Sequence, residues 1–458
     1  MRRKNSSFFV VILFLALILG AVGFIFSSEE FEKNPPKIDI ADEVYWNLKS
    51  PINVDISDDT GIKFIRVSLS DGANEMAIFS EAFDGKDGQK HLELTVPKSA
   101  FFANKKASYT MNIEAVDKSK WNFFSGNVTT KQVKVTVDTT RPEIYIISNS
   151  YSISRGGAAA VVFRASDNAL KELYIRVKGA SQNFMPFKFI KEGFYAAIIP
   201  WAAASPDFSA DIIAKDFAGN EAKEHIRYYH GDKKYRTSYI SLKDNFIDGK
   251  IADLTARYAK DADSMDRLAK MKFVNETLRG ENEQKIHSLT TAVDDGVISS
   301  FNISPFYPLK NGKKVADFAD HRFYTYGDDK KVVSESWHMG LDLASVAAAP
   351  IIASNPGRVV FASENGIYGL NLLIDHGYGI YSLYAHCSSL AVAQGDEVSA
   401  GERIASTGTS GLALGDHLHF GILIQGVEVL PQEWMDKKWI NDNITGVLNA
   451  GKKAISEQ

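Results

Sequence analysis

The chain has 458 residues, of which 45% are hydrophobic and 24% charged, a composition typical of folded globular protein. The formal net charge is −4, from 52 basic and 56 acidic residues, so no overall basic field indicates a nucleic-acid ligand. The single cysteine, Cys387, excludes a disulfide within the chain and a zinc site built from several thiolates. The length predicts two to four domains, and any transition-metal site must use histidine and carboxylate ligands.

The N-terminal segment predicts a membrane anchor. Basic residues 2–4 precede an uncharged apolar stretch of 19 residues, Phe8–Phe26, which is long enough to span a bilayer as a helix. A cleavable signal peptide, with Ala21 and Gly23 near the cleavage site, is the alternative, although its apolar part is usually only about 7–15 residues long. We therefore expect residues 1–28 to form a single-pass anchor in the inner membrane, with the bulk of the chain on the outer, periplasmic side.

The next two segments read as copies of one domain. "SDDTGIKFIRVSL" from Ser57 is echoed by "SDNALKELYIRVK" from Ser166, with a period of roughly 100 residues. Short β-branched and aromatic runs alternate with turns rich in Asp, Asn and Gly, which predicts immunoglobulin-like β-sandwiches over residues 35–139 and 140–232. Acidic turns such as those of Asp58 and Asp216 are a possible calcium signal, but turn chemistry alone explains them and is the preferred interpretation.

From about Asp244 the apolar residues recur with a helical period, as in Ile251, Leu254 and Tyr258. Residues 244–298 are predicted to be a helical connector. We hypothesise that this connector covers the groove of the following domain until a partner moves it. A last domain is expected over residues 300–440, where glycine and short strands return, with a tail at 441–458.

Five of the ten histidines fall between residues 338 and 419 of this last domain: His338, His376, His386, His417 and His419. Side chains alternate in a strand, so His417 and His419 are expected on one face and Leu418 and Phe420 on the other. His338 and Asp342 are four residues apart and also share a face. Two neutral imidazoles and one carboxylate make a three-ligand zinc site with an open fourth position, which is typical of catalytic zinc.

Four stretches together resemble the lysostaphin-type zinc metallopeptidases, which cut peptide bonds of bacterial peptidoglycan: "SWHMGLDLAS", "IDHGYGIYSLYAH", "VAQGDEVSAGERIASTGTSG" and "GDHLHFGILIQG". The resemblance covers about Phe301 to Trp439. It implies that His338, Asp342 and His419 bind one Zn²⁺ per chain, and that His386 and His417 act beside the metal as general base and as oxyanion stabiliser or proton donor. It also implies antiparallel strands around a long groove.

Several neighbouring residues depart from the family pattern or have open roles. Gly421, Asp416 and Cys387 differ from common family residues without removing a ligand, and His376 is interpreted as structural. Arg322 is a candidate to meet a substrate carboxylate, although an ordinary surface role is equally expected. The loop "STGTSG" from Ser406 lacks the Gly-Lys-Ser/Thr ending of a phosphate loop, so it is predicted to shape the groove.

The sequence thus predicts a mainly β, multidomain, envelope-anchored zinc endopeptidase acting on peptidoglycan peptides, without nucleic-acid binding. A catalytically silent or latent wall-binding regulator of another cell-wall hydrolase is one alternative. A structural, adhesin-like protein is another, in which the tandem immunoglobulin-like domains carry the function and the zinc domain is vestigial. Separately, the immunoglobulin-like or helical segments are candidates to bind an envelope protein.

Overall fold

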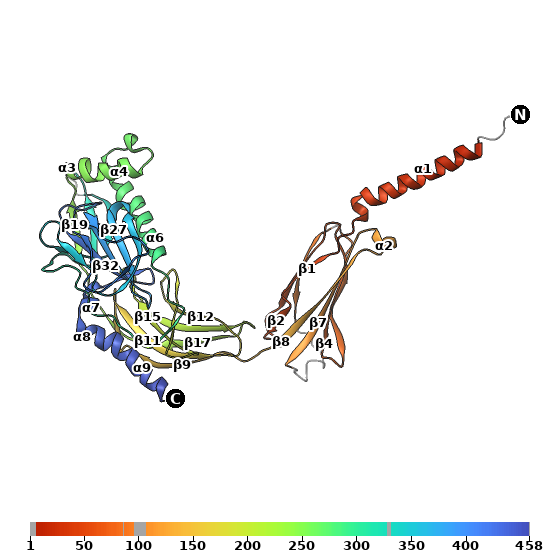
Figure 1. Cartoon of the computed structure of the whole chain (residues 1–458), viewed down its shortest axis with the longest axis horizontal. Helices are drawn as coiled ribbons and strands as arrows, with labels where there is room; N and C mark the ends of the chain where they lie inside the picture. Colours follow the sequence, from red (N-terminus) through yellow and green to blue (C-terminus); the bar gives the residue numbers. More distant parts are fainter. Residues whose placement is uncertain (1–5, 86, 96–106, 328–330, 458) are drawn as a thin grey trace. The chain divides into compact units, whose positions relative to one another are not determined.

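A computed structural model describes residues 6–85, 87–95, 107–327 and 331–457 of the chain (Figure 1). The chain forms two compact units. The first comprises residues 1–142 with the short segments 167–171 and 215–221, and the second comprises the rest. The fold is mainly β, as expected, with a few helices.

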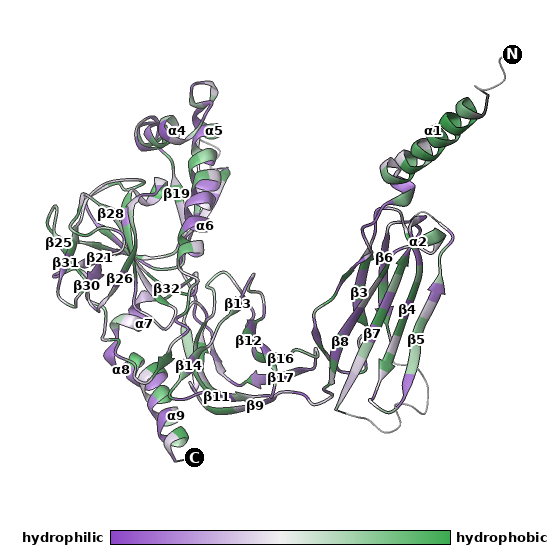
Figure 2. Cartoon of the chain, turned by 45° about the vertical axis from the view of Figure 1, so that its right-hand side comes forward, coloured by the Kyte–Doolittle hydropathy of each residue, from purple (hydrophilic) through white to green (hydrophobic). Residues whose placement is uncertain are grey.

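The first unit begins with helix α1 (Ser6–Ser27), which confirms the predicted N-terminal helix. Figure 2 shows hydrophobic residues along most of this helix. Phe8–Ser27 is, among the described residues, the one helical stretch long and apolar enough to cross a membrane, and none of it is buried in the protein. Twenty helical residues span about 30 Å, the thickness of a bilayer's hydrocarbon core.

Two sheets follow α1 and enclose one core. Val54, Val67, Met111 and Val133 are completely buried between them, and strand β3 alternates buried and exposed residues, as a half-buried strand must. One sheet has the order β1 (Lys37–Asp39), β3 (Ile52–Ser57), β6 (Gln89–Leu94). The other has the order β2 (Glu43–Trp46), β8 (Val128–Val137), β7 (Ser108–Asp117), β4 (Ile62–Ser70), β5 (Glu75–Ala82).

A second pair of sheets lies at the start of the second unit. Their order is β13 (Asn183–Phe184), β12 (Leu170–Val177), β16 (Ala210–Asp216), β17 (Glu221–Ile226) in one, and β20 (Val297–Ile298), β14 (Phe187–Phe189), β15 (Phe194–Pro200), β11 (Ala158–Ser166), β9 (Glu143–Asn149) in the other. The predicted C-terminal tail contributes α9 (Gly446–Ser456), which packs on β9 and β11. The immunoglobulin-like assignment of both sheet pairs stays a prediction.

The predicted connector is helical and contributes to a hydrophobic core. Its main elements are α3 (Asp244–Phe246), η3 (Ile247–Ile251), α4 (Ala252–Tyr258), α5 (Arg267–Lys272), η5 (Phe273–Leu278) and α6 (Arg279–Leu289). Ile251, Val274 and Leu278 of the connector are buried in one cluster with Leu383 and Leu423 of the C-terminal sheet.

That C-terminal sheet is antiparallel and has the order β21 (Lys313–Ala316), β24 (Leu341–Ala344), β32 (Leu418–Ile424), β28 (Ile380–Cys387), β27 (Leu370–Asp375), β26 (Gly357–Glu364), β30 (Glu397–Val398). A smaller sheet has the order β19 (Thr237–Ser241), β22 (Asp320–Thr325), β23 (Val332–His338). The connector covers one face of the large sheet. Leu418, Phe420 and Ile422 point into a separate core on the other face.

Candidate metal centre and active site

Three strands bring His338, Asp342 and His419 together. His338 is the last residue of β23, and Asp342 lies in β24 directly opposite His419 of β32. Leu341 and Phe420, which neighbour these polar residues and pair with each other, belong to the apolar core. Strand alternation therefore buries the leucine and phenylalanine and leaves the carboxylate and the imidazole on the other face.

The polar atoms of this trio converge on one point. Nε2 of His338 lies 3.0 Å from Oδ1 of Asp342 and 3.1 Å from Nδ1 of His419, and this Nδ1 lies 2.9 Å from the same Oδ1. Donors at about 2.0–2.1 Å from a tetrahedral zinc ion stand roughly 3.3 Å apart, so the three atoms need little movement to share one ion. The set is therefore a candidate metal site.

The environment of His338 prepares Nε2 as a ligand. Its Nδ1–H donates to the backbone carbonyl of Asp317 at 2.7 Å, which leaves Nε2 of a neutral ring without a hydrogen. Nε2 of His338 nevertheless lies close to Oδ1 of Asp342 and Nδ1 of His419, and both of these atoms can carry lone pairs. A cation between the three atoms would stabilise this arrangement. Burial disfavours the charge of Asp342, but the close contacts with the rings of His338 and His419 outweigh it and hold the pKa of this carboxyl well below its usual range.

The two remaining histidines of the predicted set lie beside the trio. The ring centre of His386 is 4.9 Å from that of His417 and 5.8 Å from that of His419, and Nε2 of His417 is 3.7 Å from Oδ2 of Asp342. Nδ1–H of His386 donates to the carbonyl of Ser410 at 2.9 Å, and Nδ1–H of His417 donates to that of Gly415 at 2.7 Å. Both rings therefore present Nε2 as the free nitrogen.

His386 occupies an unusual backbone position at the end of β28. Its φ of 62° lies in the left-handed region, and the register between β27 and β28 shifts nearby, between Leu370 and Leu372. A non-glycine residue in this region costs roughly 1–2 kcal/mol, and such strain often accompanies functional sites. Burial, together with the neighbouring His419 and His417, lowers the pKa of His386 to about 3, so its imidazole stays neutral near pH 7.

Two residues close to the site had no signal in the sequence. A Cβ on Gly340 would lie 2.4 Å from Nε2 of His419, so only glycine leaves room for this ring. The ring of Tyr368, which is buried, packs edge-on against His419 at 5.7 Å between ring centres. The sequence also could not predict that the backbone carbonyls of Asp317 and Ser410 accept hydrogen bonds from site histidines, since every residue type carries a carbonyl.

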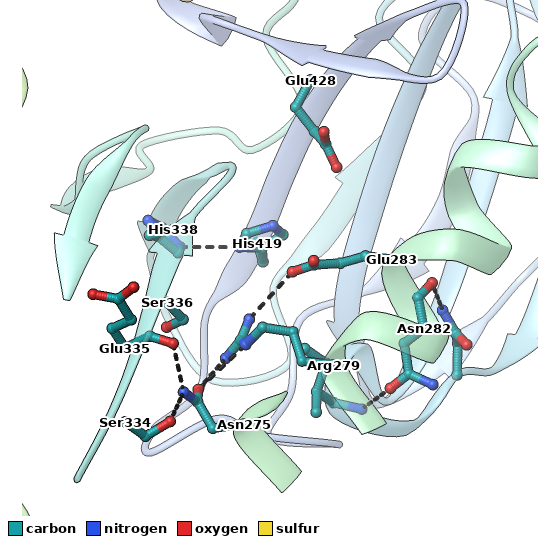
Figure 3. Close-up of polar contacts among 12 residues, drawn as sticks. Asn275, Arg279, Asn282, Glu283, Ser334, Glu335, Ser336, His338, His419 and Glu428 are labelled. Carbon is teal, nitrogen blue, oxygen red and sulfur yellow. Dashed lines mark hydrogen bonds and ion pairs between the residues drawn. The ribbon is translucent and has the colours of Figure 1, made fainter. Parts of the chain in front are cut away.

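The connector also contacts the strand that ends at His338. Asn275 of η5 donates from Nδ2 to Oγ of Ser334 at 2.8 Å and to the carbonyl of Glu335 at 3.0 Å, both in β23. Arg279 in turn donates to Oδ1 of Asn275 at 3.1 Å. Figure 3 shows these connector side chains, with Glu283, between the helix and the strands that carry His338 and His419. The connector thus supports the position of a candidate ligand.

The other residues singled out in the sequence serve the fold. His376 hydrogen-bonds the carbonyl of Pro356 at 2.8 Å and Oγ of Ser382 at 2.7 Å, and burial lowers its pKa to about 4. Arg322 pairs with Asp320 at 3.3 Å. In the loop 406–411, Ser410 Oγ donates to the carbonyl of Cys387 at 2.8 Å and Thr407 bonds Asp416, so these hydroxyls hold the loop against the segments that carry His386 and His417.

The acidic turns of the first unit form two further clusters of carboxylates, Glu32 with Asp58 and Asp117, and Asp138 with Asp167 and Asp216. Oδ1 of Asp58 accepts hydrogen bonds from the backbone amides of Thr60 and Gly61, the arrangement of an ordinary turn. These contacts support the turn interpretation.

Comparison with known proteins places the site in a family. Residues 336–431 match the family model described as peptidase family M23. DD-carboxypeptidase/endopeptidase Mpg of Neisseria meningitidis serogroup B is 39% identical over 94 residues, 20% of this chain and 22% of that protein. Murein hydrolase activator NlpD of Salmonella dublin is 31% identical over 135 residues, 28% of this chain and 35% of that protein. The chain thus spans about a fifth to a third of the length of these relatives.

Among solved structures, a peptidase M23 from Pseudomonas aeruginosa is similar to this chain at 17% identity and a TM-score of 0.39, covering 62% of this chain and 94% of the other. The C-terminal part of the chain carries a peptidase family M23 domain, which confirms the resemblance. All five predicted site residues fall within the matched segment.

Proposed function

We propose that this M23 domain makes the chain a zinc-dependent endopeptidase that hydrolyses peptide bonds, crosslinks or stem peptides, of bacterial peptidoglycan. The observation that carries the proposal is the convergence of five side chains from four segments of the chain: His338, Asp342 and His419 as zinc ligands, with His386 and His417 beside them. Two imidazoles and one carboxylate are a set typical of catalytic zinc.

The donor set of the trio fits zinc. Zinc bound there would polarise a substrate carbonyl and lower the pKa of its water to about 7. His338 is held in the ligating tautomer by its hydrogen bond to Asp317, and the ionised carboxyl of Asp342 supplies the negative charge that a dication favours.

We assign different roles to the two other histidines. Nδ1–H of His386 is engaged by the carbonyl of Ser410, so Nε2 carries the lone pair that a general base needs. Nε2 of His417 lies 3.7 Å from Oδ2 of Asp342, at the edge of the trio, and we assign this ring the role of oxyanion stabiliser or proton donor to the leaving amine.

Helix α1 supports a location in the cell envelope. We propose that it anchors the chain in the inner membrane, with the β-rich units on the outer, periplasmic side. A similarity to a murein hydrolase activator keeps the alternative of a silent or latent regulator open to test. The adhesin-like alternative predicts instead that the envelope partner binds residues 30–240 and that cleavage is absent.

The experiment compares purified full-length chain with its His338→Ala variant. We expect one zinc per chain and release of peptide fragments from purified peptidoglycan by the parent, and loss of both in the variant. The masses of the products would identify the bond. Full cleavage that resists chelators in the variant would refute the zinc assignment, whereas zinc without cleavage in the parent would favour the regulator.

A further inference from the structure

The end of the first unit next to α1 exposes aromatic side chains. The turn α2 (Trp121–Phe124) connects β7 to β8, and Phe123 is 98% and Phe124 67% exposed. Figure 1 and Figure 2 show this turn beside the C-terminal end of α1. Two neighbouring phenylalanines exposed on one turn are unusual for a surface in contact with water.

The turn is fastened to the segment that directly follows α1. Lys120 donates its backbone N–H to the carbonyl of Glu30 at 2.7 Å, and Oγ of Ser119 donates to the carbonyl of Glu32 at 2.7 Å. The ring of Trp121 lies 6.1 Å from that of Phe26, in the last turn of the helix. The hydrogen bonds and ring contacts thus hold the turn close to the point where the chain leaves α1.

Further ring and cation contacts extend this attachment. The ring of Phe124 lies 6.2 Å from that of Phe31, and Nζ of Lys33 lies over the rings of Phe26 at 4.3 Å and Trp121 at 4.4 Å. Tryptophan is enriched where a membrane protein crosses the lipid–water interface, and a lysine there can lay its stem on apolar groups while its charged head stays in water. The contacts of Trp121 and Lys33 at the end of α1 are compatible with a bilayer interface.

The backbone of the turn is strained. Asn122, Phe123 and Phe124 have φ values of 49°, 55° and 69°, so three consecutive non-glycine residues adopt the left-handed conformation. The amide of Asn122 donates to the carbonyl of Gly126 at 3.3 Å, and Nζ of Lys63 donates to the carbonyl of Phe124 at 3.4 Å, which supports this shape. Phe123 is 98% exposed, so its ring gains no packing inside the unit that would offset this strain.

We propose that residues 119–126 form a second contact with lipid, in which Phe123 and Phe124 insert into the interface of the bilayer that α1 crosses. The inference rests on the proposed anchoring by α1. Lipid is the occupant because the turn is continuous with the end of the spanning helix and offers aromatic rings flanked by lysines. A second attachment point would restrict how far the first unit tilts on its anchor, and would thereby limit the reach of the M23 domain into the wall.

The test places one nitroxide label at a time on the full chain in lipid nanodiscs of phosphatidylethanolamine and phosphatidylglycerol. Collision rates of the label with oxygen, which concentrates in lipid, and with a water-soluble nickel chelate report its depth. Labels are attached through Phe123→Cys, Leu17→Cys and Ala73→Cys. Ala73 is the matched control, because it lies between β4 and β5 at the opposite end of the sandwich from Asp117. The native Cys387 is fully buried and accepts no label.

We expect the labels at positions 17 and 123 to favour oxygen and the label at 73 to favour nickel. If position 17 favours oxygen and position 123 favours nickel, the lipid contact is refuted while the anchor stands. If position 17 favours nickel, the anchor itself is refuted, and the contact with it. A label at 123 that is immobilised and shielded from both reagents would show a protein covering the turn, which also overturns the inference. Zinc content and cleavage, measured on the same samples, test the enzymatic proposal separately.

Discussion

Nδ1 of His386 lies 2.9 Å from the carbonyl oxygen of Ser410, and this hydrogen bond joins a strained strand residue to the loop 406–411. It selects the tautomer in which Nε2 carries the lone pair, and it ties the orientation of the ring to the position of the loop. The same loop accepts the backbone N–H of His417 at the carbonyl of Gly408, at 3.1 Å. One loop therefore positions both proposed proton-transfer groups.

The first prediction concerns His386. His386→Ala is expected to lower kcat for peptidoglycan cleavage by about 10²–10⁴, because general acid–base groups contribute on this scale. Zinc content should stay at one per chain, because this side chain is not among the proposed ligands. Metal analysis and product release on the same sample check both points. Equal loss of zinc and turnover would assign His386 to the metal site instead.

A second prediction concerns the space beside His419. Gly340→Ala would drive a methyl group to 2.4 Å from Nε2 of this ring, so the ring must move away from its partners. We expect zinc affinity to fall by about 10–100-fold, the scale seen when groups that orient metal ligands are lost. Competition with a chelator of known zinc affinity measures this change in zinc affinity. Gly280→Ala is the matched control, since nothing lies within 4 Å of its Cβ and a helical alanine should leave affinity unchanged.

Stability is expected to depend on pH through His376. Its pKa is about 4 in the folded chain because burial disfavours the charged ring, against about 6.5 when unfolded. Between pH 4 and pH 6.5 the unfolded state therefore binds more protons than the folded state. The contribution of His376 to the free energy of unfolding is fully present above pH 6.5 and is lost as the pH falls toward 4, by up to about 3 kcal/mol.

Hydrogen exchange of peptides around Ser382, which bonds the His376 ring, measures this dependence between pH 7 and pH 4.5. His376→Gln should weaken the pH dependence after correction for intrinsic exchange. An unchanged slope in this variant would assign the pH dependence to other groups.

The connector leads to a fourth prediction. Removing residues up to Ile298 would uncover Leu373, Tyr381, Leu383 and Leu423, which are completely or almost completely buried. Each large apolar side chain contributes about 1.5–3 kcal/mol when buried, so the isolated domain from Phe301 is expected to unfold at a lower temperature than the full chain. We therefore expect truncation to reduce cleavage, contrary to the hypothesis of a removable cover.

Thermal unfolding and cleavage by the two forms check this expectation. A deletion of residues 1–142 is the control, because it leaves the core shared by the connector and the large sheet in place. A stable and more active fragment from Phe301 would restore the hypothesis that the connector covers the groove.

Much of the site could be predicted from local sequence. Apolar length alone predicted α1, and strand alternation predicted that Leu418 and Phe420 point into the core while His419 faces the other way. The spacing of His338 and Asp342 predicted that their side chains share a face, and Nε2 of the one lies 3.0 Å from Oδ1 of the other. These features depend only on the geometry of residues close together in the sequence. They therefore do not depend on how distant segments pack.

Other features depended on contacts between distant segments. Gly340 carries no side chain to signal its role, and the carbonyls of Asp317 and Ser410 are chemically the same as every other carbonyl. The helical period of the connector was visible, but its packing against the large sheet was not.

The sequence by itself determined the apolar N-terminal helix and the mainly β character, and it indicated the five candidate site residues, because each follows from residue type and short-range spacing. Only the tertiary structure decided that Asp342 stands opposite His419 and which nitrogen each histidine leaves free. It also decided that the connector forms part of a core. Register, hydrogen-bond partners and burial arise when segments far apart in the chain pack together.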